Sequence, residues 1–230
     1  MRTRTGLAAL ALLTLGLLSG CGGLHPGIAA EAGNQSITDS DVDKLAQDVC
    51  TTLKSDQRLI GTGFARSTLL QSVVQSFVMR AMAEQMADEY AVTSSPQYDS
   101  VVEQTKLQFG SLDPALRDRI MDTWTASQYF LDILSTIGRK ELEAAGTDVP
   151  ATDAGDQQAL QKGIALAQAW EADNGVQIDP RFPDITLADD SFTRTDDETA
   201  YAVSDLAKQA AAQPPDAAWI QSLPASQRCV

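Results

Sequence analysis

The chain has 230 residues, and its 17 Lys and Arg against 31 Asp and Glu give a formal net charge of −14 at pH 7. A negative charge of this size repels the phosphates of nucleic acids and anionic lipids, which excludes nucleic-acid binding. The length is sufficient for one sizeable hydrophobic core.

The first twenty residues have the parts of an export signal. Arg2 and Arg4 give the chain a positive start, and an apolar run of thirteen residues follows from Gly6 to Leu18. A transmembrane helix needs about 20 apolar residues, so this run is too short to span a bilayer. A short apolar segment behind basic residues is typical of a signal peptide, which we predict for residues 1–20.

The signal ends in Leu18-Ser19-Gly20-Cys21, which resembles a bacterial lipobox. In a lipobox the thiol of the cysteine carries a diacylglycerol, and the cysteine becomes the mature N-terminus. We therefore predict lipidation of Cys21, a flexible tether over residues 21–28, and a lipid anchor on the extracytoplasmic side of the cell membrane. Loss of Arg2 and Arg4 leaves 15 basic against 31 acidic residues, a formal charge of −16. The alternative is an ordinary signal peptide followed by a chance cysteine.

Two further cysteines, Cys50 and Cys229, remain after lipidation of Cys21. Exported proteins reside where disulfides persist, and an even number of leftover cysteines favours a bridge. We predict a Cys50–Cys229 disulfide that joins the C-terminus to the first helix of the mature chain. The alternative is two free thiols.

The mature chain begins with a short strand over Ala29–Ala32 and a turn over Gly33–Ser36. Thr38 is a favourable N-cap, and the acidic residues after it suit the helix dipole. We therefore predict a helix from about Asp39 to Lys54, followed by a loop over Ser55–Gly63.

The clearest helical signal is an apolar stripe of about six turns. Charged residues, among them Arg80 and Glu84, fall on the remaining surface, which predicts a core helix with one solvated face. The members of the stripe recur at helical spacing and are Leu69, Leu70, Val73, Val74, Phe77, Val78, Ala81, Met82, Met86 and Tyr90.

The later helices have recognisable ends. One is predicted from Ser95-Pro96 to Phe109. Asp113 as N-cap and Pro114 at the first helical position begin another, of about 30 residues, that ends at Gly146. The elements predicted after it are a linker over Thr147–Gly155, a helix over Asp156–Asn174, a strand over Val176–Ile178, an extended or irregular stretch over Phe182–Thr195, and helices over Glu198–Ala212 and Asp216–Ser222.

The single histidine, His25, lies in the predicted tether. This position excludes serine–histidine and cysteine–histidine triads and argues against a zinc site. The sequence has no Gly-x-Ser-x-Gly, no Gly-rich phosphate-binding loop and no Cys-x-x-Cys. We therefore predict no cofactor, no metal, no nucleotide and no enzymatic activity. An enzyme that uses a carboxylate pair stays an alternative, because acidic residues are plentiful.

Asp39, Asp41 and Asp43 have the alternating spacing of a calcium-binding loop. An EF-hand loop needs Gly at its sixth position and Glu at its twelfth, where this chain has Lys44 and Cys50. The three acids are therefore interpreted as residues that favour a helix N-terminus.

Three tryptophans and a second run of acidic residues are further candidates for a functional site. Trp124, Trp170 and Trp219 could line a binding groove, but helical spacing favours the core for the first two. Asp196-Asp197-Glu198 is interpreted as the acidic start of a helix.

Three segments carry a resemblance to a known family. Ala30–Val42 contains a short strand, an Asn/Gly turn, Ile-Thr and an acidic helix start. Ala83–Val92 ends an amphipathic helix, and Val176–Phe182 offers a later strand. In this order the segments resemble the SurA-type periplasmic chaperone domain, and the chain looks like bacterial lipoproteins that carry it. The family's Asn-Gly turn is Gly33-Asn34 here.

Together with the predicted elements, the resemblance implies a single domain over residues 29–230. We expect a mainly α fold, a bundle of long amphipathic helices with a small two-stranded β element. In that element Val176–Ile178 pairs with the segment near Ala29–Ala32 and packs beside the helices.

The resemblance also implies a function, namely chaperone-like binding of exported or unfolded polypeptides on the apolar surface of a helical frame. Many members carry a parvulin prolyl-isomerase domain between helical parts. Here Ser95–Asn174 is predicted as helices and no histidine is available, so we expect no prolyl isomerase activity. The alternative is a structural or assembly lipoprotein that docks one dedicated cell-envelope partner. The sequence does not identify which residues would bind a polypeptide.

Overall fold

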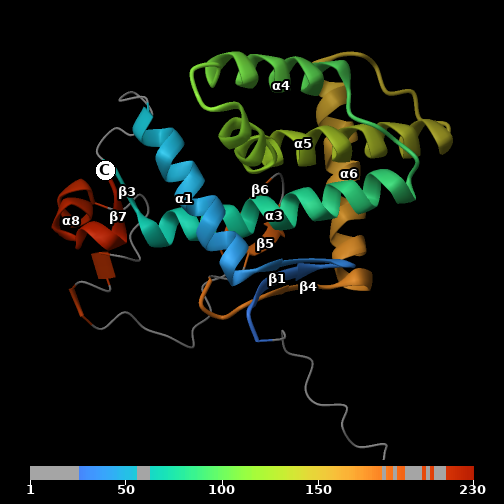
Figure 1. Cartoon of the computed structure of the whole chain (residues 1–230). Coiled ribbons are helices and arrows are strands. Elements are labelled where there is room, and N and C mark those ends of the chain that lie inside the picture. Colours follow the sequence, from blue (N-terminus) through green and yellow to red (C-terminus); the bar gives the residue numbers. More distant parts are fainter. Residues whose placement is uncertain are drawn as a thin grey trace, which may run out of the picture.

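The computed structural model places most of the chain from Pro26 onward, and Figure 1 labels its elements. The described residues are 26–55, 63–182, 185–188, 191–194, 204–205, 208–209 and 216–230. Within them the fold is mainly helical, with a small antiparallel sheet formed by N- and C-terminal segments, as the sequence predicts.

The sheet lies at the start of the domain. Ala32 lies opposite Val176 in antiparallel register, which confirms the predicted pairing of these two segments. The sheet has three strands rather than two, because the chain between the turn and the first helix also pairs with the central strand. In the order of their pairing the strands are β2 (Gln35–Thr38), β1 (Ile28–Ala32) and β4 (Val176–Ile178).

The predicted four-residue turn is shorter in the structure. Gln35 and Ser36 belong to β2, and only Gly33 and Asn34 connect the strands. Gly33 has φ +55°, the left-handed region that suits a tight hairpin turn. The polar composition of Gly33–Ser36 therefore predicts a turn two residues longer than the one observed.

Five long helices form the body of the domain. Four have a side-chain N-cap: Thr38, as predicted, and Ser95, Asp113 and Thr152 each accept a backbone N–H of the first turn. The cap at Thr152 explains why the last of these five helices starts at Asp153, three residues before the predicted Asp156. The helices are α1 (Asp39–Ser55), α3 (Arg66–Glu89), α4 (Pro96–Gln108), α5 (Pro114–Ala144) and α6 (Asp153–Asn174).

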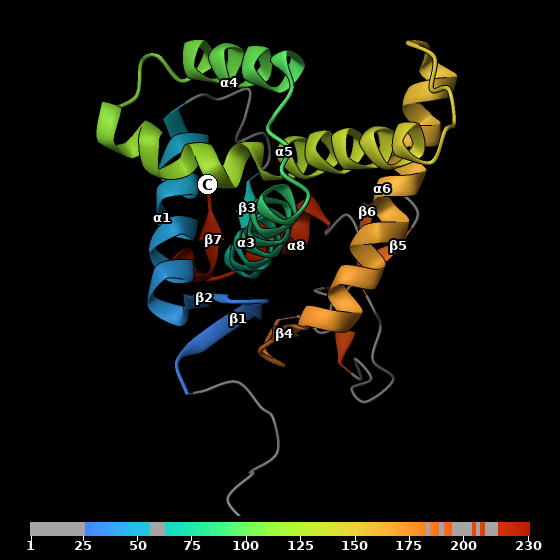
Figure 2. The ribbon, with the colours of Figure 1, turned by 90° about the vertical axis from the view of Figure 1, so that its right-hand side faces the viewer.

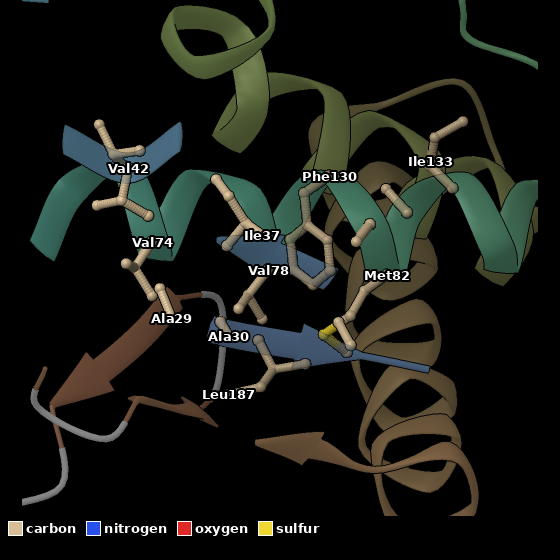
Figure 3. Close-up of a cluster of buried hydrophobic side chains, with 14 of the residues drawn as sticks. Ala29, Ala30, Ile37, Val42, Val74, Val78, Met82, Phe130, Ile133 and Leu187 are labelled. Carbon is tan, nitrogen blue, oxygen red and sulfur yellow. The ribbon is translucent and has the colours of Figure 1, made fainter. Parts of the chain in front are cut away.

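Helix α3 runs through the centre of the fold. Figure 2 looks roughly along it and shows α1, α5, α6 and the sheet arranged around it, with α4 on the outer side of α5. The predicted apolar stripe supplies most of its buried residues, from Leu69 to Met86. In Figure 3, Val78 and Met82 of α3 point toward β1, and Leu187 lies near Ala30 of that strand.

Helices α5 and α6 cross at very short range. A Cβ atom on Gly138 would lie 1.9 Å from the carbonyl oxygen of Ala159, and one on Gly163 would lie 2.0 Å from that of Leu134. Only glycine lets the two backbones approach this closely. The crossing therefore fixes how α6, and the β4 strand that follows it, is placed against the bundle.

The C-terminal part adds short elements. The predicted extended stretch forms a hairpin of β5 (Ile185–Ala188) and β6 (Ser191–Arg194). The predicted helix over 198–212 lies outside the described residues except for 204–205 and 208–209. The last elements are α8 (Ala217–Ser222), a 3₁₀ turn (Ala225–Gln227) and β7 (Arg228–Cys229), which pairs with β3 (Phe64–Ala65).

Candidate functional site

The three acids with calcium-loop spacing each have a structural role. Asp41 accepts a hydrogen bond from the hydroxyl of Thr38 at 2.6 Å, at the start of α1. Asp43 pairs with Arg66 at 3.0 Å, and Asp39 pairs with Arg181 at 2.7 Å. These contacts point the carboxylates in different directions, and no cluster of metal-ligating side chains occurs among the described residues.

The three tryptophans do not meet in one groove. Trp170 is buried beneath the β1–β2 turn, where its ring approaches Gly33. Trp124 packs edge-on against Phe109 with ring centroids 4.8 Å apart. Trp219 is buried in a separate small cluster with Ala65. The preference for the core is therefore confirmed for Trp170, whereas Trp124 is only partly buried.

The segments that carry the family resemblance meet at the β1–β2 turn. Gln85 of α3 accepts a hydrogen bond from Asn34 N at 3.0 Å and donates to Ala32 O at 2.9 Å. Gly33 N donates to the carbonyl of Gly175, directly before β4. The Gln85 side chain thus binds the turn to α3, and the backbone of the turn is hydrogen-bonded to the residue before β4.

A polar cluster centred on Arg80 joins α3, α4 and α5. The Arg80 guanidinium donates to Glu84 at 2.7 Å and to the Tyr98 hydroxyl at 3.1 Å, and it lies 3.2 Å from Asp122. It also stacks over the Tyr129 ring at 4.2 Å. Desolvation lowers the pKa of Arg80, but its acidic neighbours and Tyr98 outweigh this and leave that pKa raised.

The Arg80 cluster is better explained as an attachment than as a reactive site. The polar groups around Arg80, namely Glu84, Tyr98 and Asp122, all contact its guanidinium group. Burial raises the pKa of Tyr129, which keeps that phenol protonated at neutral pH. The hydroxyl of Tyr98 also lies 3.0 Å from that of Thr125 on α5. The cluster therefore attaches α4 to the bundle through polar groups.

Helix α4 has little apolar burial of its own. Its buried residues are Tyr98 and Thr105, which both carry a hydroxyl group. Asp132 of α5 accepts hydrogen bonds from the backbone N–H and the hydroxyl of Ser95, directly before α4. Leu107 on its outer face is 81% exposed. The only other large apolar residue that is exposed among those described is Val230, at 42%.

The predicted disulfide is present. Cys50 of α1 and Cys229 of β7 are bonded, with their Cα atoms 5.7 Å apart, within the range that a bridge requires. Cys229 is buried, whereas Cys50 is partly exposed. The bridge fixes the end of the chain to the first helix, as expected.

Several predicted residues lie outside the described residues. They include the lipidation residue Cys21, the lone His25 and the acidic run Asp196-Asp197-Glu198. Within the described part of the chain, no helix is long and apolar enough to cross a membrane.

Compared with known proteins, the chain matches no family model, no curated protein and no solved structure. The resemblance to the SurA-type domain therefore rests on the sequence segments themselves.

Sequence reasoning missed the roles of Arg80 and Gln85. The apolar pattern predicts Arg80 on the solvated face of α3, yet its side chain is only 24% exposed. The signal available was its place between Met79 and Ala81 in a long apolar segment. Gln85 offers no such signal, because the turn groups that it contacts are backbone groups more than 50 residues away in sequence.

Proposed function

We propose that the protein is a lipid-anchored, chaperone-like binder of exported or unfolded polypeptides on the extracytoplasmic side of the cell membrane. The antiparallel pairing of Ala30–Ala32 with Val176–Ile178 is the observation that carries the proposal. The resemblance implied this contact between segments almost 150 residues apart in sequence. The way Gln85 holds the turn adds a link from the same sheet to α3.

The helical frame supports the proposal in a second way. Helix α4 is attached to α5 mainly by polar and aromatic contacts, such as Ser95 to Asp132 and Phe109 to Trp124. Trp124 of α5 lies against Phe109, directly after α4. A polypeptide binder on such a frame needs no nucleotide and no metal, because binding follows from apolar surface alone. Prolyl isomerase activity is not part of the proposal.

An aggregation assay tests this proposal. Stoichiometric mature protein should slow the aggregation of a reduced, unfolded client, and chemical crosslinking should capture the client. The same protein should leave the cis–trans exchange of a proline peptide unchanged. Unaltered aggregation without client capture would contradict the chaperone function.

A second candidate is a structural or assembly lipoprotein that docks one dedicated envelope partner. The observation that favours it is the small exposed apolar area, since only Leu107 and Val230 among the large apolar residues described are exposed. A client-binding chaperone typically offers a broader apolar surface than two separate side chains. Failure of the aggregation assay would put this candidate first.

The anchor has its own test. Cys21→Ser should release the protein from the membrane fraction or block its processing, because a lipobox serine has no thiol to carry the lipid. A variant that stays lipid-modified and membrane-bound would contradict the assignment of Cys21.

A further inference from the structure

The C-terminal residues Asp216–Val230, here called the C-terminal strap, lie against the end of α1 and the start of α3. Figure 1 shows α8 and β7 beside β3 at this end of the molecule. The strap contributes Trp219 and Ile220 to a small apolar cluster with Ala65, and this cluster is separate from the main core. Cys229 is the one strap residue in the main core, so the rest of the strap is a local attachment.

The non-covalent hold on the strap is weak. The β3–β7 ladder has two residue pairs, Phe64 with Cys229 and Ala65 with Arg228. Two buried donors of the strap, Trp219 Nε1 and Arg228 Nε, have no hydrogen-bond partner among the described residues. Each unpaired donor loses its hydration without compensation when the strap docks. Docking of the strap therefore buries only a small apolar cluster and leaves two buried donors without hydrogen bonds.

The strap nevertheless fits closely at its end. A Cβ atom on Gly63 would lie 2.4 Å from Val230 and 2.8 Å from the carbonyl of Cys229. Gly63 also has φ +96°, which side chains rarely adopt. This glycine lets the last residues lie directly against the start of β3. The covalent bond from Cys229 to Cys50 then holds them there.

We infer that the Cys50–Cys229 disulfide is a redox-controlled latch, meaning that its reduction releases the C-terminal strap. Release opens the hydrogen-bonding edge of β3 (Phe64–Ala65) and the buried Ala65, so that an extended apolar polypeptide segment binds in the place of β7. The release is independent of the proposed function. The proposed binding of a polypeptide at β3 rests on the proposed function, because it names a surface and a binding mode for the same polypeptide clients.

The chemistry is thiol–disulfide exchange with a dithiol. A dithiol thiolate attacks Cys50 Sγ, the partly exposed partner, and the Cys50–Cys229 bond breaks as a mixed disulfide forms. Cys229 leaves as a thiolate and takes up a proton. The second thiolate of the dithiol then displaces Cys50, so the dithiol is oxidised to a disulfide and both cysteines end as thiols.

The occupant is argued from the strap itself. β7 pairs with β3 in antiparallel register, so β3 already forms a ladder with an extended strand. The side chains that the strap places beside it are apolar, namely Trp219, Ile220 and Leu223. An incoming segment with backbone groups to pair and apolar side chains to bury meets the same requirements. The strap then acts as an internal competitor for this site.

Hydrogen–deuterium exchange of the full mature chain, with and without dithiothreitol, tests the release. Reduction should speed exchange in 217–230 and at the Phe64–Ala65 edge at least about tenfold, while the α3 amides from Val73 to Met86 keep their protection. The double variant Cys50→Ser with Cys229→Ser should match the reduced protein without any reductant. It also separates loss of the bridge from other effects of dithiothreitol.

Two exchange results would overturn the latch. Unchanged protection of 217–230 after reduction would mean that the strap holds without the bridge. Loss of protection in α3 as well would mean that the bridge supports the whole fold.

Binding of carboxymethylated α-lactalbumin, a permanently unfolded chain, tests the second half. The double variant should bind it at least about fivefold more tightly than the oxidised protein. Equal affinity would overturn β3 as the acceptor strand and leave the proposed function in place. Absence of binding to either form would contradict the proposed function too, whereas the exchange result would still decide the release.

Discussion

At the residue scale, Gln85 connects three parts of the chain. Its amide accepts from Asn34 N and donates to Ala32 O and to Ala81 O, so both ends of the amide are used. The turn backbone would otherwise lose its partner on α3. A side chain that satisfies distant backbone groups in this way is costly to remove, because it leaves those groups without a partner.

Gln85→Ala should therefore lower the free energy of unfolding by about 1–3 kcal/mol in a denaturant titration. Gln104→Ala is the matched control, since Gln104 is an exposed glutamine within α4. Its substitution should change stability by less than about 0.5 kcal/mol. Equal effects of the two substitutions would show that the hydrogen bonds of Gln85 do not hold the turn.

Glu171 on α6 gives a prediction for pH dependence. Burial raises the pKa of its carboxyl group, and desolvation is the sole cause. A raised folded-state pKa means that the stabilising contribution is present below the ordinary pKa and is lost as pH rises through the folded-state value. At neutral pH the ionised Glu171 thus destabilises the fold.

Glu171→Gln should raise Tm at pH 7, and this gain should disappear as the pH is lowered below about 4, where the wild-type carboxyl is protonated. Asp173→Asn is the control, because Asp173 is an exposed carboxylate on the same helix. It should leave Tm nearly unchanged at both pH values. A gain for Glu171→Gln that persists in acid would exclude desolvation as its cause.

At the element scale, the crossing of α5 and α6 decides where the C-terminal half of the fold lies. Gly138 and Gly163 face each other's helix backbones with no room for a methyl group. In an ordinary helix, Gly→Ala stabilises by about 1 kcal/mol. Here steric overlap with Ala159 O should reverse that sign.

Gly138→Ala should lower the free energy of unfolding by at least about 2 kcal/mol. Gly146→Ala is the contrast, since its added methyl meets nothing within 4 Å although φ is +82°. That strain alone costs about 1–2 kcal/mol. Circular dichroism with denaturant measures both values, and a stabilised Gly138→Ala protein would refute the close crossing.

The sequence predicted elements with strong local signals and missed those that depend on distant partners. The long helices follow from apolar spacing and from caps such as Asp113. The start of α6 was misplaced because Thr152, an equally good cap, stands in a polar linker. The two-residue strands β3 and β7 were not predicted, because two residues carry no periodicity and the disulfide brings them together.

At the scale of the whole molecule, the apolar stripe of α3 proved to be core. It accounts for the fold and leaves little apolar surface for a client among the described residues. The fold class was therefore predictable from helical periodicity, and the sheet pairing from the family resemblance. A binding surface was not, because exposure depends on how α4 and the C-terminal strap cover the helices.

Crosslinking on intact cells tests the central claim most directly. The wild-type protein is crosslinked and purified, and the captured proteins are identified by mass spectrometry, with Cys21→Ser as the control for membrane placement. The account predicts many unrelated exported polypeptides bound to the wild-type protein. Capture of one envelope protein alone, in constant ratio to the protein itself, would contradict the chaperone function and identify a dedicated partner instead.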